Sequence, residues 1–271
     1  MCIRDSTRND RYYLPSSDYQ LDTVIIHKEQ VRHCTNIQKR GTMIKVDNIS
    51  KQYGNNTLLQ IDQLTFNEGE TVGIVGNNGA GKTTLFNIIL DLIAPTTGRL
   101  YLKDKSNQTD EEWKKFTSAF IDESFLIQFL TPNEYFEFIS GLNGNPQSKS
   151  TELMHSFAEF YNDEIIGVKK YIRDLSKGNQ KKIGLTSTFI GNPDIIIWDE
   201  PFSNLDPSSQ LRLKNIIKER KGKHTWLISS HDLNHIVDVC DRIIILEKGI
   251  VVEDLINNGE AQQRLDGYFQ V

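Results

Sequence analysis

The sequence predicts an α/β fold in which a mainly parallel sheet is covered by helices on both faces. Short apolar runs of strand length, such as residues 195–198, alternate with segments whose apolar residues recur at helical spacing. A glycine-rich loop at 76–84 follows an apolar, β-branched run at 71–75 and precedes an apolar segment long enough for a helix. The prediction depends on this strand–loop–helix order and on the alternation of the two element types.

The composition of the 271-residue chain restricts its class. Its length allows one large domain or two lobes with a full core. The net charge of −5 argues against a nucleic-acid partner held by a basic surface. No apolar run approaches the roughly eighteen residues of a membrane-spanning helix, so we expect no membrane crossing by this chain. Cys2, Cys34 and Cys240 lie far apart without metal-ligand spacing, which favours a reducing cytosol.

The regular pattern begins at Met43. Residues 1–42 show neither a signal-peptide hydrophobic region nor an amphipathic period. Because residues 1–6 resemble a translated sequencing-adapter fragment, we interpret this extension as partly or wholly an artefact, with Met43 as the natural start. The alternative is a real, mostly disordered extension. In either case we assign it no function.

An antiparallel β subdomain is predicted around the first strands. Residues 43–48 alternate between apolar and polar side chains, and 58–66 read as a second strand. Between them, 51–56 is predicted as a turn-rich loop that exposes one aromatic residue, Tyr53. A further strand is predicted at 99–102.

A helical lobe is predicted from about 124 to 182, inserted into the α/β core after a buried strand at 116–121. Thr131 and Glu134, with a proline between them, have the spacing of a capping box at a helix start. The apolar residues expected to share one face of that helix are Tyr135, Phe138, Ile139 and Leu142. Residues 152–161 suggest another helix.

The core returns after the lobe. Asp206 and the proline after it are predicted to begin a helix. His231 is expected to open another helix after a strand at 225–229. Strands at 242–246 and 250–253 follow, and the predicted domain of 43–271 ends in a tail at 254–271.

The glycine-rich loop fits the phosphate-loop pattern G-x-x-x-x-G-K-[ST] at every fixed position. Glycines let successive backbone N–H groups point into one concavity, and the dipole of the following helix adds partial positive charge there. Lys82 would reach the β- and γ-phosphates, and the Thr83 hydroxyl would ligate Mg²⁺. An ordinary glycine-rich turn is the alternative. The predicted ATP-binding residues of the loop are Gly76, Asn77, Asn78, Gly79, Ala80, Gly81, Lys82, Thr83 and Thr84.

Two carboxylates, Asp199 and Glu200, end the apolar run at 195–198. A strand that ends in an acid is how phosphate-loop NTPases place a carboxylate near Mg²⁺, and Asp199 suits this role. Glu200 can take a proton from the attacking water. A solvated strand end is the alternative reading, and the complete phosphate loop favours the functional one.

A third motif, Leu175-Ser176-Lys177-Gly178-Asn179-Gln180, makes the interpretation specific. With it, residues from about 43 to 253 resemble the nucleotide-binding subunits of ABC (ATP-binding cassette) transporters, most like the bacterial exporter-type ATPases. In that family this signature contacts the γ-phosphate bound by the opposite subunit. The resemblance implies that role for Ser176, Lys177, Gly178 and Asn179.

Further positions are assigned singly by the resemblance. Tyr53 resembles the aromatic residue that stacks on adenine, and His231 resembles the switch histidine that contacts the γ-phosphate. Loop packing for Tyr53 and helix capping for His231 are the alternatives. The residues that resemble the loop crossing the dimer interface are Ser203, Asn204, Leu205 and Asp206.

Two features depart from the family pattern. Glu123 aligns with a usual glutamine at the junction of core and lobe. It can still face Mg²⁺ or the water, but it adds negative charge near the phosphates. Lys177 and Asn179 stand where glycine and glutamine are commonest. Gly178 is kept, so we expect binding to survive.

The resemblance implies an ATPase that dimerises around two ATP molecules with Mg²⁺ and drives separate integral membrane permease subunits. Such a subunit lies at the cytoplasmic face of the membrane. We expect export, docking around 123–138 with Phe125, Phe129, Tyr135 and Phe136 at the groove, and no nucleic acid. Whether the dimer is a homodimer or a heterodimer stays open.

Three alternative functions involve other classes of protein. Fewer than about a hundred residues and no heptads separate Lys82 from Ser176, which argues against a chromosome-maintenance or DNA-repair ATPase. A ribosome-bound factor of the superfamily would need two cassettes. A nucleotide-gated regulatory module with little turnover is the alternative from another class.

Overall fold

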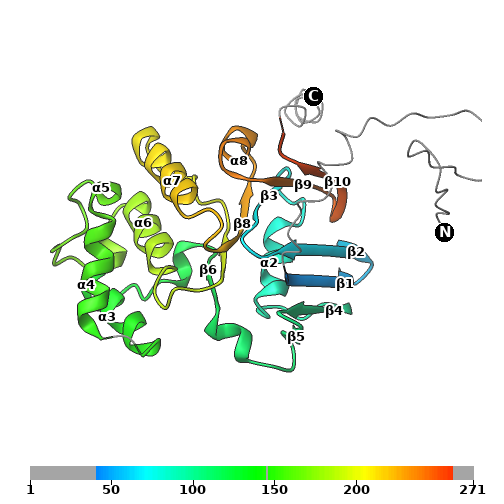
Figure 1. Ribbon diagram of the computed structural model, residues 1–271, viewed down its shortest axis with the longest axis horizontal. Helices are drawn as coiled ribbons and strands as arrows, with labels where there is room; N and C mark the ends of the chain where they lie inside the picture. Colours follow the sequence, from blue (N-terminus) through cyan, green and yellow to red (C-terminus); the bar gives the residue numbers. More distant parts are fainter. Residues whose placement is uncertain (1–40, 145, 259–271) are drawn as a thin grey trace, which may run out of the picture. The chain divides into compact units, whose positions relative to one another are not determined.

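The computed structural model describes residues 41–144 and 146–258 (Figure 1). One sheet has four strands in the order β2-β1-β4-β5, and all of its pairs are antiparallel. This is the antiparallel β subdomain that the sequence predicts. Its strands are β1 (Thr42–Tyr53), β2 (Asn56–Asn67), β4 (Thr97–Leu102) and β5 (Lys105–Ser106).

The second sheet has six strands in the order β10-β9-β3-β8-β7-β6. Every neighbouring pair is parallel except β10 and β9, so the prediction of a mainly parallel sheet is confirmed. All residues of β3, β7 and β8 are buried, as expected for strands covered on both faces. The strands are β3 (Thr71–Val75), β6 (Thr117–Phe120), β7 (Ile195–Trp198), β8 (Thr225–Ser230), β9 (Arg242–Glu247) and β10 (Ile250–Ile256).

The parallel sheet separates two apolar cores. One core lies against the antiparallel sheet and includes α2 (Lys82–Ile89), with alternate strand residues such as Ile195 and Ile197. The other receives the opposite residues, such as Ile196 and Trp198. The helices on that side include α7 (Pro207–Glu219) and α8 (Leu233–Val239). This period-two alternation is what places the helices on both faces.

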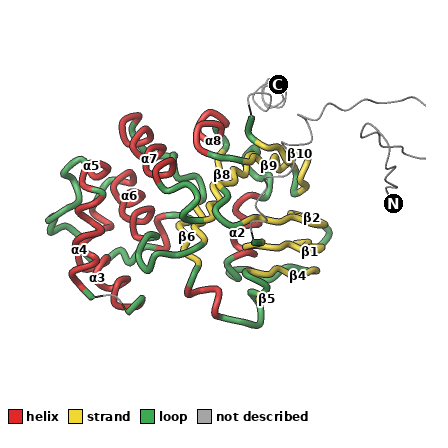
Figure 2. The backbone as a smooth tube through the Cα atoms, viewed as in Figure 1, coloured by secondary structure: helices red, strands yellow, loops and turns green. Residues whose placement is uncertain are grey.

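The helical lobe leaves the core after β6 and returns to it at β7, and Figure 2 shows it as mainly helical. Its α-helices are α3 (Pro132–Leu142), α4 (Gln147–Ser156), α5 (Ala158–Tyr161) and α6 (Lys177–Ser187). Three short 3₁₀ helices complete the described helical segments, at η1 (Glu112–Lys115), η2 (Glu123–Phe125) and η3 (Ile172–Asp174). α6 runs five residues past the predicted end of the lobe.

The predicted capping box at α3 is present. Thr131 Oγ1 accepts a hydrogen bond from Glu134 N at 3.4 Å, and Glu134 Oε2 accepts one from Thr131 N at 2.8 Å. The predicted apolar face is confirmed for Tyr135 and Ile139, which pack in or against the core, and is wrong for Phe138 and Leu142, which are 47% and 70% exposed. The buried residues of α3 are Pro132, Tyr135, Phe136 and Ser140, so the packed face is rotated toward Phe136.

Smaller differences concern element ends. β1 and β2 run into a tight hairpin whose turn is Gly54–Asn55, because a glycine with φ of 58° permits a two-residue turn where the composition suggested a longer loop. His231 does not open a helix: Asp232 caps α8 by accepting from Asn234 N at 2.9 Å. β10 runs to Ile256, past the predicted strand end.

The interpretation of 1–42 and the tail after 258 lie outside the described residues, apart from 41 and 42. No helix in the described part of the chain is long and apolar enough to cross a membrane.

Candidate nucleotide-binding site

The residues predicted to bind phosphate, bind metal or act in catalysis lie together at one edge of the parallel sheet. The phosphate loop follows β3, Asp199 and Glu200 follow β7, and His231 follows β8. These three strands are neighbours in the order β3-β8-β7, so their carboxyl ends bring the three segments together. The carboxyl edge of a parallel sheet is where ligands bind in open α/β folds.

The backbone of the phosphate loop depends on its glycines. Gly79 and Gly81 have φ of 81° and 106°, a region that other residues rarely adopt. A Cβ on Gly76 would lie 2.3 Å from Leu246 O, so no larger residue fits there. Ala80 N donates to Asn77 O at 3.0 Å and closes the turn. The loop is therefore a tight backbone cradle between β3 and α2.

Lys82 is buried and its ammonium contacts three groups. It donates to Gly76 O at 2.6 Å and to Asn77 O at 3.4 Å. It lies 3.5 Å from Glu200 Oε1. The first residue of α2 thus holds a positive charge beside the cradle and the carboxylate after β7.

Asp199 is a buried carboxylate that accepts two hydroxyl hydrogen bonds. Thr83 Oγ1 donates to Asp199 Oδ2 at 2.5 Å, and Ser229 Oγ donates to Asp199 Oδ1. Burial raises the pKa of Asp199, while the hydrogen bonds from Ser229 and Thr83 oppose that shift. The predicted Mg²⁺ ligands, Thr83 and Asp199, are therefore adjacent.

The donor set at this point fits Mg²⁺ held together with a nucleotide. A hydroxyl and one carboxylate are hard oxygen ligands, and Mg²⁺ is commonly bound by one or two carboxylates plus substrate phosphates. Within the described ranges, no group of three or more His, Cys, Asp or Glu side chains could hold a metal ion by itself. Phosphate oxygens would have to complete the coordination.

Glu200 lies between a lysine and a histidine. Its Oε1 faces Lys82, and its Oε2 lies 2.8 Å from Nδ1 of the exposed His231. Its backbone N donates to Ser229 Oγ at 2.9 Å. The structure therefore brings together the three residues that the sequence analysis assigns to catalysis, and it adds Ser229, which that analysis missed. A serine two residues before His231 is the only signal the sequence offered.

A second missed residue, Lys181, connects this cluster to the lobe. Its Nζ lies 3.6 Å from Glu123 Oε1 and donates to Glu200 O at 3.0 Å and Ser203 Oγ at 2.5 Å. Burial lowers the pKa of Lys181, and the charge of Glu123 is the largest opposing cause. Glu123, which the sequence analysis places near the phosphates, thus contacts a cation next to Glu200.

The signature residues begin α6 and lie against the loop that is predicted to cross a dimer interface. Ser176 Oγ caps the helix by accepting from Asn179 N at 3.2 Å. A Cβ on Gly178 would lie 2.9 Å from Asn204 O. In the described part of the chain, no hydrogen bond or ion pair joins residues 176–179 to 76–84.

The remaining predicted residues differ in exposure. Tyr53, at the end of β1, is 57% exposed, and Lys51 Nζ lies 4.8 Å from its ring centroid. In the loop after β7, Leu205 is buried and Asp206 caps α7 by accepting from Ser209 N at 3.0 Å. Among the four aromatic residues expected at the docking groove, Phe125 and Phe129 are exposed, whereas Tyr135 and Phe136 are buried.

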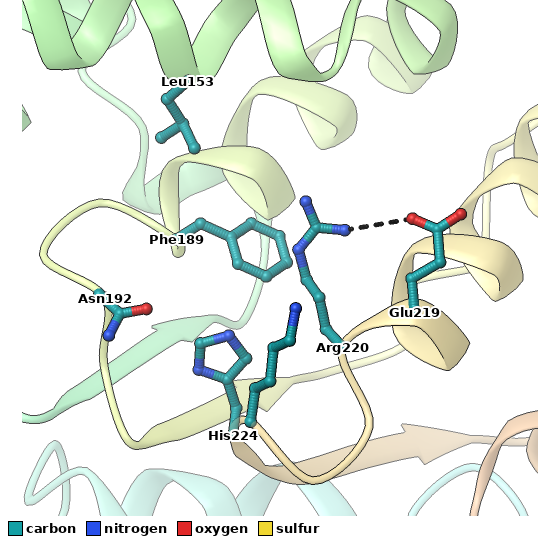
Figure 3. A pocket seen from close by; sticks show the side chains of 7 residues that line it. Leu153, Phe189, Asn192, Glu219, Arg220 and His224 are labelled. Carbon is teal, nitrogen blue, oxygen red and sulfur yellow. Dashed lines mark ion pairs between the residues drawn. The ribbon is translucent and has the colours of Figure 1, made fainter.

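A hollow of about 330 Å³ lies at the opposite edge of the sheet, by the amino ends of β7 and β8 (Figure 3). The Arg220 guanidinium lies 5.0 Å from the ring centroid of Phe189 and 3.8 Å from Glu219. His224 also lines the hollow, and burial lowers its pKa. Arg220 and Phe189 join α7 to the end of the lobe, so we interpret this hollow as part of a packing junction.

Comparison with known proteins gives the same result for sequence and structure. A family model described as "ABC transporter" matches residues 59–203. An uncharacterised ABC transporter ATP-binding protein of Methanocaldococcus jannaschii, MJ1023, is 38% identical over 77% of this chain and 76% of its own length. The bacitracin transport ATP-binding protein BcrA of Enterococcus faecalis is 27% identical, covering 82% of this chain and 71% of its own.

Among solved structures, the fold is similar to the dimeric structure of the ATP-binding cassette MJ0796 bound to ADP and Pi. The TM-score is 0.71 and the identity 25%, over 80% of this chain and 100% of the other.

Proposed function

Because the chain belongs to the family of ABC transporter ATP-binding subunits, we propose that it binds ATP, hydrolyses it as a dimer and drives separate membrane permease subunits. One observation carries the proposal: Lys82, Thr83, Asp199, Glu200 and His231 meet at the carboxyl edge of one sheet. Each has the chemistry required for one task in phosphoryl transfer to water.

The proposed tasks follow from the contacts. The N–H groups of the phosphate loop and the Lys82 ammonium would bind the phosphates. Thr83 and Asp199 would hold Mg²⁺, which when bound neutralises charge on the phosphate oxygens. Glu200 accepts a proton from the attacking water, and His231 orients that carboxylate through Oε2. Tyr53 would stack on the adenine.

Two chains would complete each site. We place Ser176–Asn179 against the ATP of the opposite subunit and Ser203–Asp206 across the interface. The dimeric cassette at 25% identity supports this arrangement, as does the absence of any hydrogen bond or ion pair between 176–179 and 76–84 in the described chain. The dimer would dock on permease subunits at the cytoplasmic face of the membrane, with exposed Phe125 and Phe129 at the contact.

Replacing the proposed base tests hydrolysis. We expect Glu200→Gln to lower kcat for ATP by about 100- to 10,000-fold, because a general base is lost. Binding of ATP, measured by equilibrium titration, should persist because Lys82 and the loop are intact. Glu111→Gln is the control, since Glu111 is exposed and pairs with Lys114 in the segment that precedes β6. A wild-type rate as low as that of Glu200→Gln would favour the regulatory module.

Permease partners are tested by capture from detergent-solubilised membranes of the native cell, with tagged Glu200→Gln and ATP. A stoichiometric multi-span membrane protein is expected, whereas ribosomal or DNA-associated partners would contradict the transport role.

For the direction we propose export, supported by the exporter-like signature with Lys177. In vesicles reconstituted with the captured complex, only complexes whose ATP-binding subunits face outward can use the added ATP. In that orientation export moves a substrate into the vesicle, so ATP-driven uptake would support export. Outward movement would contradict export.

A further inference from the structure

The buried ammonium of Lys181 is surrounded by polar partners, which is typical of a functional side chain rather than of one that only packs. It lies on α6 and is 4% exposed. Its three contacts are an ion pair with Glu123 and hydrogen bonds to Glu200 O and Ser203 Oγ. Three donors are all that an ammonium has. Each contact belongs to a different segment: the lobe junction, the end of β7 and the following loop.

The backbone of Glu200 is held in an uncommon conformation. Its φ is +47°, in the left-handed region that disfavours side chains with a Cβ. Its carbonyl accepts from Lys181 Nζ at 3.0 Å, Ser203 Oγ at 2.9 Å and Ser203 N at 3.3 Å. Such a conformation persists only when its surroundings hold it. Lys181 is the charged member of the set that does so.

The charges of the cluster also require Lys181. Glu123 is largely buried, and its Oε1 accepts no hydrogen bond despite lying 3.6 Å from Lys181 Nζ. Asp199, Glu200 and Glu123 are three carboxylates, against the two ammonium groups of Lys82 and Lys181. Removing Lys181 would leave a buried carboxylate unpaired beside the place where the phosphates would bind, which is unfavourable.

We propose that Lys181 is a positioning residue for ATP hydrolysis, because its ammonium fixes the backbone of Glu200 and ties it to Glu123 and Ser203. The inference rests on the proposed function of Glu200 as the general base. Glu123 is then one half of a charge pair whose other half is supplied by α6. Because Ser176 and Gly178 begin the same helix, a contact at the signature would reach Glu200 through Lys181.

Steady-state kinetics on four variants test the proposal: Lys181→Met, Lys181→Gln, Glu123→Gln and the double variant Lys181→Gln/Glu123→Gln. We expect Lys181→Met to lower kcat by about tenfold or more with KM for ATP little changed, because only the base is misplaced. Lys181→Gln should lose less, since its amide can still donate to Glu200 O. The double variant should recover kcat relative to Lys181→Gln, because it removes both charges.

The control is Lys182→Gln on the same helix. Lys182 is also buried, but its ammonium lies 5.7 Å from the Phe160 ring centroid, and in the described part of the chain it forms no hydrogen bond or ion pair with Glu123 or Glu200. It should change thermal stability without a comparable loss of kcat. If Lys181→Met and Lys181→Gln are folded and keep kcat within about twofold of wild type, the proposal is wrong. If both single variants fail to fold, the double variant decides: a kcat below that of Glu123→Gln supports the proposal, and an equal kcat overturns it.

Hydrogen exchange separates failure of this inference from failure of the proposed function, because it requires no hydrolysis. Ser203 N donates to Glu200 O, so its amide reports on that carbonyl. In Lys181→Met the peptide covering 200–204 should exchange faster than in wild type, with little change in Lys182→Gln. Unchanged exchange would overturn the positioning role even in a protein that never hydrolyses ATP.

Discussion

Ser229 joins the two carboxylates that stand side by side after β7. Its hydroxyl donates to Asp199 and accepts from Glu200 N, so one buried side chain serves both residues. Lys82 and Thr83 could be predicted because the motif that contains them is local. Ser229 and Lys181 could not be predicted, because β8 and α6 bring them to the site from distant positions in the sequence. Their contacts depend on how these elements pack, and no local motif spacing indicates them.

Replacing Ser229 with alanine should destabilise the protein. A buried hydrogen bond to a charged group contributes about 1.5–3 kcal/mol, so we expect the free energy of unfolding to fall by about that amount. Urea unfolding measures the change. Ser230→Ala is the control, since the Ser230 hydroxyl accepts only a 3.0 Å bond from Asp232 N and should cost about 1 kcal/mol. Equal losses in the two variants would contradict the role of Ser229.

At the scale of elements, helix starts are easier to predict than helix faces. The α3 capping box uses only nearby residues, and it forms as the sequence predicts. The buried face of α3 depends on where other parts of the lobe lie, and Phe138 and Leu142 are exposed although their spacing fits an apolar face. A Cβ on Gly184 of α6 would lie 2.0 Å from the Phe120 ring, which shows how closely the lobe approaches β6.

The start of α7 makes a pH-dependent prediction. Hydrogen bonds from Ser208 and Ser209 hold the pKa of Asp206 below its ordinary value. A carboxyl with a depressed folded pKa stabilises the fold above its unfolded pKa, about 4, and this stabilisation is lost as pH falls through the folded pKa. Asp206→Ala should therefore cost about 1 kcal/mol near pH 7, as the loss of an N-cap does. The difference from wild type should shrink below about pH 4.

Unfolding by urea at about pH 7, 5 and 3 measures this dependence on Asp206. Asp206→Asn is the matched control, because an asparagine still caps a helix but does not titrate. Its stability should change less than that of Asp206→Ala near neutral pH. A difference between wild type and Asp206→Ala that stays constant down to pH 3 would exclude the charged cap.

At the scale of the whole molecule, the α/β core carries the phosphate loop and the helical lobe carries the signature. The sequence predicts both parts and their order along the chain. The contact between them through Glu123 and Lys181 is not predictable, because it depends on how the lobe returns to the sheet. The signature and the phosphate loop are also separate motifs within one chain, which leads to a prediction about its assembly.

ATP with Mg²⁺ should double the mass of Glu200→Gln in solution, because bound nucleotide would join the phosphate loop of one copy to the signature of the other. Size-exclusion chromatography with light scattering measures the mass. Adding Lys177→Glu should weaken that dimer, since Lys177 is exposed and the substitution places a negative charge toward the phosphates. A mass unaffected by ATP in Glu200→Gln, or a dimer equally strong with Lys177→Glu, would contradict this assembly.

The position of β3 within its sheet has a consequence for synthesis on the ribosome. Thr71 pairs with Trp226 and Val72 with Arg242, so the strand before the phosphate loop has both neighbours in the last part of the described chain. The hairpin of β1 and β2 can close as soon as it emerges, whereas pairings this distant form late. A nascent chain stopped before β9 would carry the whole phosphate-loop sequence and still lack the lateral support that shapes it. The capacity to bind nucleotide should therefore arise only after β9 has been synthesised, and until then β3 has two unpaired edges.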